Sequence, residues 1–126
     1  MDSSAEREVV LVVEDEPAIR RMIDKALSGG GYTVLQASNG LDAETLIEAH
    51  TNIRLVILDI VMPGGNGLDF ANYLHTQRPG TEILYISGFA DSIAVDSIAR
   101  RKPMAMLTKP FTPSQLLDRV RKLTAA

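Results

Sequence analysis

The chain contains no cysteine, so it has neither disulfide bonds nor thiolate metal sites. It also contains no apolar run near the ~18 residues that cross a bilayer, and we therefore expect no membrane insertion. Residues 1–8 are polar and acidic, which excludes a secretory signal peptide and predicts a flexible leader. These absences are compatible with the cytoplasm, which is the location we expect.

Neither sign of charge dominates the chain. The formal net charge of −3 does not favour nucleic acid, so we expect no nucleic-acid partner. The 126 residues are 45% hydrophobic and 23% charged, which is ordinary for one globular domain with a real core. No repeat or linker divides the chain, and we predict a single domain over residues 9–124.

Strand-like and helix-like patterns alternate five times. We predict strands at residues 9–13, 33–37, 55–58, 82–86 and 104–107. Each strand is followed by a helical pattern: from Pro17 to about Gly29, around 43–47 and ending near 50–52, at 68–74, roughly at 92–101, and from Pro113 after the N-cap Thr112. Five such units predict an α/β three-layer sandwich with right-handed crossovers.

Polar residues stand where these predicted strands end. Glu14 and Asp15 follow the first strand, Asp59 the third, Ser87 the fourth and Lys109 the fifth. Ligands of open α/β sheets bind outside the carboxyl ends of the strands. Close carboxylates repel one another and persist as a cluster when a divalent cation or a lysine neutralises them. The pattern therefore predicts a functional site at this edge.

Each of these residues also has an ordinary explanation when taken alone. A strand-end aspartate often caps a turn or a helix, and Glu14 and Asp15 could cap the first predicted helix. Ser87 before Gly88 is a common turn pair. The coincidence of all of them at strand exits favours a shared site.

Four segments resemble the receiver domain of two-component response regulators. They are LVVEDEP at 11–17, LDIVMPGGNG at 58–67, ISG at 86–88 and KPF at 109–111. Each is weak alone, but four in order at strand exits are specific, and the resemblance covers about residues 9–123. It implies a flavodoxin-like fold whose five-stranded parallel sheet has the order 2-1-3-4-5. The versions ISGFA and KPFTP look more like receivers of hybrid histidine kinases.

The resemblance also implies a chemistry. Asp59 would take a phosphoryl group from a histidine kinase or a phosphotransfer protein. Glu14, Asp15 and Asp59 would hold one Mg²⁺, for which Mn²⁺ would substitute, with the backbone carbonyl of Val61 as a further oxygen ligand. The domain would be a signalling domain and not an enzyme, although it takes part in its own phosphorylation and dephosphorylation.

Further residues of the resemblance concern the switch. Lys109 and Ser87 would contact phosphoryl oxygens, and a cis peptide bond is expected before Pro110. Phosphorylation would switch partner interactions, with the downstream partner expected on the face of the fourth helix, fifth strand and fifth helix. Receivers usually carry tyrosine or phenylalanine where this chain has Met106. We therefore expect the loop at 88–91 and the start of the fourth helix, rather than Met106, to carry the coupling.

Two other classes use similar sheets. A Mg²⁺-dependent phosphodiester enzyme of the Toprim kind needs an Asp-x-Asp pair, but Val61 stands at the second position after Asp59. A flavin-binding flavodoxin-like module needs a hydroxyl-rich phosphate loop after the first strand. The acidic run at 14–16 would repel a phosphate there.

Overall fold

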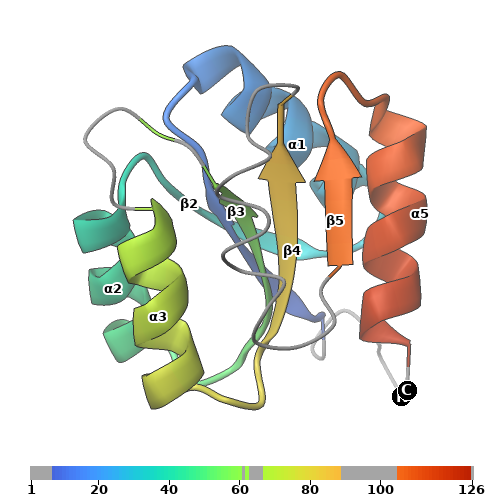
Figure 1. Ribbon diagram of the computed structural model, residues 1–126. Coiled ribbons are helices and arrows are strands. Elements are labelled where there is room, and N and C mark those ends of the chain that lie inside the picture. Colours follow the sequence, from blue (N-terminus) through green and yellow to red (C-terminus); the bar gives the residue numbers. More distant parts are fainter. Residues whose placement is uncertain (1–6, 61, 63–66, 89–104, 126) are drawn as a thin grey trace.

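Five parallel strands form one sheet in the computed structural model of the chain, which describes residues 7–60, 62, 67–88 and 105–125 (Figure 1). The strands are β1 (Val9–Val13), β2 (Thr33–Ala37), β3 (Ile53–Asp59), β4 (Glu82–Ser87) and β5 (Ala105–Thr108). Their spatial order is β2-β1-β3-β4-β5. The predicted flavodoxin-like α/β fold is confirmed.

Helices cover both faces of the sheet and complete three layers. The described helices are α1 (Pro17–Gly29), α2 (Gly40–Ala49), α3 (Gly67–Gln77) and α5 (Pro113–Thr124). Figure 1 shows α2 and α3 on one side of the sheet, and α1 and α5 on the other. The helix predicted at 92–101 lies outside the described residues.

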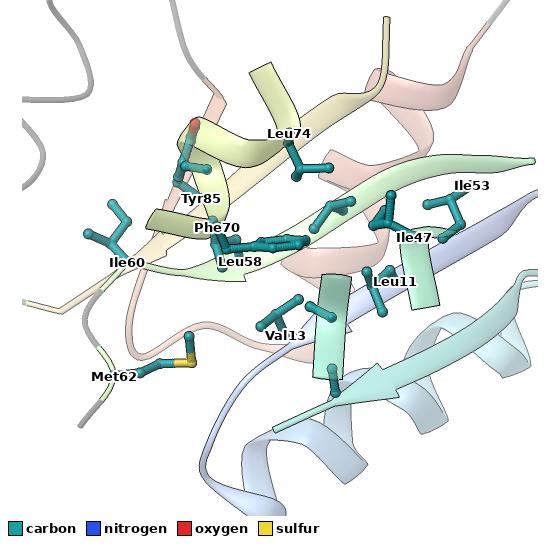
Figure 2. Close-up of a cluster of buried hydrophobic side chains, with 14 of the residues drawn as sticks. Leu11, Val13, Ile47, Ile53, Leu58, Ile60, Met62, Phe70, Leu74 and Tyr85 are labelled. Atoms are coloured by element: carbon teal, nitrogen blue, oxygen red, sulfur yellow. The ribbon is translucent and has the colours of Figure 1, made fainter. Parts of the chain in front are cut away.

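The central strand β1 explains why its sequence shows no polar alternation. All five of its residues are buried because helices cover both faces. Leu11 and Val13 pack into the layer of α2 and α3, shown in Figure 2. Val10 and Val12 pack against α1 and α5. The unbroken valine-rich run is therefore the sequence mark of a strand at the centre of the fold.

Helix starts agree with the sequence and some strand ends do not. Pro17 opens α1, and the Thr112 side chain and Gln115 form a reciprocal capping box at the start of α5. The strand β3 begins at Ile53, two residues earlier than predicted, because Ile53 pairs with Val9 of β1. The polar Arg54 interrupts the apolar run, so the sequence pattern did not indicate that the strand extends to Ile53. None of the helices in the described ranges has the length and apolar character of a bilayer-crossing segment.

Candidate functional site

Sheet register brings the strand-end residues to one edge. Val13 of β1 lies opposite Leu58 of β3, so the residues that follow them leave the sheet side by side. Oxygen atoms of the Glu14, Asp15 and Asp59 carboxylates all lie within 4.8 Å of one another. The predicted acidic cluster is present.

Lys109 neutralises part of this cluster. Its Nζ atom donates a hydrogen bond to Asp59 Oδ2 at 3.2 Å and lies 3.3 Å from Glu14 Oε1. Burial works to lower the pKa of Lys109, but the negative charges of Asp59 and Glu14 outweigh burial and raise it. The ammonium group therefore stays charged between the two carboxylates. The peptide bond from Lys109 to Pro110 is cis.

Glu14 is the most deeply buried acid of the cluster, with no exposed surface. Its Oε2 atom accepts a hydrogen bond from the Glu16 amide, so it also serves the start of α1. Burial raises the pKa of Glu14 from 4.5 to about 7; the nearby Asp59 adds to this, while the Glu16 amide and Lys109 oppose it. Burial therefore removes water from the Glu14 carboxylate and makes its charged form less stable than in an exposed glutamate.

The donor set fits a hard divalent cation. Three carboxylates supply only oxygen atoms, which such cations prefer. Within the described part of the chain, Glu14 Oε1 is buried and forms no well-directed hydrogen bond, although the Lys109 ammonium lies 3.3 Å from it. A cation held by the three carboxylates would add positive charge at this oxygen. Val61, whose carbonyl was expected as a further ligand, lies outside the described residues.

Gly67 keeps the backbone close to Asp59. A Cβ atom at this first residue of α3 would overlap the carbonyl oxygens of Ile60 and Asp59. Any side chain there would push α3 away from the end of β3. Gly67 therefore belongs to the packing that fixes Asp59.

Ser87 lies at the same edge of the sheet, and its hydroxyl already forms a hydrogen bond. Its side chain is buried, and its hydroxyl donates to the Met106 sulfur across 3.1 Å. The Lys109 amide donates to the Ser87 carbonyl at 2.8 Å, which joins the ends of β4 and β5. The contact with Met106 was not expected from the sequence.

A model of the response regulator receiver domain matches residues 10–121 of the chain. The chain belongs to this family. The receiver is 33% identical over 118 residues to the response regulator receiver protein CpdR of Brucella abortus, which covers 93% of the receiver and 97% of CpdR. The crystal structure of the NtrX receiver domain from the same organism matches with a TM-score of 0.83 and 29% identity, over 91% of the receiver and 97% of that domain.

Longer proteins also contain a matching region. The sensor kinase CckA of Brucella abortus is 32% identical over 115 residues, which cover 90% of the receiver and 12% of CckA. The receiver spans less than half the length of several curated relatives. Receiver domains are signalling domains that interact with histidine kinases and downstream effectors. These matches support neither the Toprim-like nor the flavin-binding alternative.

Two arginines that sequence reasoning missed hold backbone carbonyls near the site. Arg20 of α1 donates to the Glu14 carbonyl at 2.7 Å, and Arg119 of α5 donates to the Met106 carbonyl at 2.6 Å. Arg20 thus fixes the residue that follows β1, and Arg119 fixes a residue within β5. Nothing in the sequence pattern distinguishes these arginines from solvated helix residues, since their partners are backbone carbonyls that belong to other elements.

The receiver also has an apolar hollow beside Lys109. Its volume is about 440 Å³, and its lining is Ile19, Met22, Gly88, Lys109, Pro110 and Phe111. Lys109 therefore lies between the acidic crevice and an apolar hollow bounded by α1 and the segment that follows β5.

The pKa of Glu14 predicts how stability depends on pH. In the metal-free receiver, the free energy of unfolding should fall as pH rises from about 5 to about 8. The folded state keeps the Glu14 proton up to a pH of about 7, whereas the unfolded state releases it near 4.5, so folding binds a proton between these values. The Glu14 contribution to this loss is up to about 3 kcal/mol.

Chemical denaturation at a series of pH values in the presence of a chelator measures this dependence. Glu14→Gln should flatten the pH profile, because the amide does not titrate. Equal slopes in wild type and Glu14→Gln would show that another group is responsible.

Proposed function

We propose that this receiver accepts a phosphoryl group on Asp59 from a histidine kinase or a phosphotransfer protein. The observation that carries the proposal is the setting of Asp59 at the end of β3. Its buried carboxylate is hydrogen-bonded to the Lys109 ammonium and lies within the cluster of Glu14 and Asp15. A carboxylate in such a setting can act as a nucleophile toward phosphorus.

The proposed step exchanges one bond to phosphorus for another. An Asp59 carboxylate oxygen attacks the phosphorus of a phosphohistidine, and a new O–P bond forms. The N–P bond of the donor breaks, and the imidazole nitrogen keeps the electron pair. Such transfers depend mainly on positioning and on neutralising the phosphoryl oxygens. Lys109 is close enough to Asp59 to supply one positive charge.

The acidic residues give the site its metal requirement. Glu14, Asp15 and Asp59, together with the Val61 carbonyl, would hold Mg²⁺, and Mn²⁺ would substitute. When bound, the cation neutralises negative charge on the phosphoryl group. The chain's own contribution is to hold the carboxylates together, with Glu14 fixed through the Glu16 amide. The same arrangement would let the receiver take part in its own phosphorylation and dephosphorylation.

The signal would leave through the side of the domain that carries β5 and α5, together with the predicted fourth helix, which lies outside the described residues. The β5 and α5 part of this face carries a polar hollow of about 350 Å³, which includes Thr108, Gln115, Asp118, Arg119 and Lys122. A hollow with charged groups of both signs suits a protein partner. Because the proposed donor is a kinase or a phosphotransfer protein, we propose a cytoplasmic location. We also propose that residues 9–124 form the receiver domain, that residues 1–8 are a leader, and that no partner is a nucleic acid.

Phosphoryl uptake from a small donor tests this function. Purified receiver incubated with acetyl phosphate and Mg²⁺ or Mn²⁺ should gain the mass of one phosphoryl group, because the metal completes the neutralisation of the site. A chelator should prevent the gain. Intact-protein mass spectrometry measures both outcomes. Equal labelling with and without metal, or no labelling with it, would contradict the proposal.

A further inference from the structure

We infer that Met106 is a positioning residue: its sulfur holds the Ser87 hydroxyl in the resting receiver and releases it to an incoming phosphoryl group. The inference rests on the proposed function. It assigns a role to the thioether at a position where the family resemblance leads one to expect an aromatic ring. The Ser87 hydroxyl donates to Met106 Sδ across 3.1 Å.

Strand register explains why these two side chains meet. In the β4–β5 pair, Tyr85 lies opposite Met106 and Ser87 lies opposite Thr108. Residues two apart on a strand point to the same face, so Ser87 shares the face of Tyr85 and Met106. Met106 is half-buried against the layer of α2 and α3. Its flexible side chain can reach the end of β4.

The strength of the contact suits a switch. A thioether sulfur is a weak acceptor, whereas a phosphoryl oxygen is charged and accepts strongly. The Ser87 hydroxyl therefore keeps a partner in the resting state but exchanges it favourably after phosphorylation. A phenylalanine ring at 106 would offer no sulfur or oxygen acceptor. The free energy of the Ser87–Met106 hydrogen bond thus opposes, by a small amount, the movement of Ser87 to the phosphoryl group.

Release of the Ser87 hydroxyl would also affect α5, outside the site. The carbonyl of Met106 accepts from Arg119 Nη1 at 2.6 Å, so the same residue joins the end of β4 to α5. Loss of the Ser87 contact frees the side chain of a residue whose backbone is held by α5. Two hydrogen bonds thus connect Ser87 to Arg119 through Met106. This gives Met106 a coupling role of its own; the loop at 88–91, for which the sequence predicts such a role, lies beyond Gly88 outside the described residues.

A double-mutant cycle without any ligand tests the resting contact. Ser87→Ala, Met106→Leu and the double variant are compared with wild type by chemical denaturation. Leucine keeps the volume but removes the acceptor. The two substitutions should be coupled by about two- to five-fold in the unfolding equilibrium constant. Additive effects would overturn the inference, whatever the receiver's activity.

Binding of beryllofluoride, a phosphoryl mimic, in the presence of Mg²⁺ tests the role. Met106→Leu should bind it about two- to five-fold more tightly, because Ser87 no longer leaves a partner. Met106→Gln should bind it more weakly, because an amide oxygen accepts more strongly than sulfur. Both effects should vanish in the Ser87→Ala background. Met62→Leu makes the same chemical change in the same hydrophobic layer and should leave affinity unchanged.

The outcomes separate the inference from the proposed function. Wild type that binds no beryllofluoride with Mg²⁺ would overturn the proposed function, and with it the role of Met106 in that function. Wild type that binds it, with no change in Met106→Leu or with changes that persist in the Ser87→Ala background, would overturn the inference alone. Backbone amide shifts on binding should include Met106 and Arg119, and their absence would also contradict it.

Discussion

Asp59→Asn is expected to abolish phosphoryl uptake, lowering its rate by about 10³-fold or more. The amide has nearly the same shape as the carboxylate but is not nucleophilic, and the side chain is buried at the end of β3 with little room for a substitute. The fold should persist, since Lys109 can still donate to the amide oxygen. Uptake of radiolabelled acetyl phosphate measures the rate, and circular dichroism checks the fold.

A matched control for this variant lies on the next helix. Asp69 is an exposed aspartate in the first turn of α3, so Asp69→Asn makes the same chemical change away from the crevice. It should label at the wild-type rate. Labelling of Asp59→Asn at a comparable rate would mean that another residue accepts the phosphoryl group.

Asp15→Ala is expected to weaken Mg²⁺ binding by at least about tenfold. Asp15 is only partly buried, yet one of its oxygens lies within 4.8 Å of ligand atoms from Glu14 and Asp59. Removing it deletes one donor from a small set. The metal-free variant should be at least as stable as wild type, because one of three mutually repelling acids is gone. Isothermal titration calorimetry measures the affinity.

The neighbouring residue supplies the control. Glu16 is exposed at the N-cap of α1 and offers no side-chain cap bond. Glu16→Ala removes the same kind of charge one residue away, and Mg²⁺ affinity should change little. Unchanged affinity in Asp15→Ala would exclude Asp15 as a ligand.

Most strands and helices could be predicted from the sequence because its hydrophobic pattern is simple. The run of valines in β1 reports burial on both faces, and Pro17 and Thr112 mark helix starts by local chemistry. The polar residues at the strand exits follow from the same reasoning, since parallel strands bring their carboxyl ends to one edge. The order of the strands came from the family resemblance, because periodicity does not encode which strands are neighbours.

Contacts across the sheet were not readable in the same way. The bond from Ser87 to Met106 depends on the register of β4 with β5, and those of Arg20 and Arg119 depend on how far a helix residue reaches. A residue pattern along the chain does not contain such distances. The burial of Glu14 was hidden for the same reason, as an acid in an acidic run looks exposed.

The most direct test of the central claim is to locate the phosphoryl group after transfer from a phosphorylated histidine phosphotransfer protein. The receiver would be digested after the reaction with Mg²⁺, and the modified peptide would be sequenced by tandem mass spectrometry. We predict a single phosphoryl group on Asp59. A group on Asp15, on Ser87 or on a histidine, with Asp59 unmodified, would contradict the account.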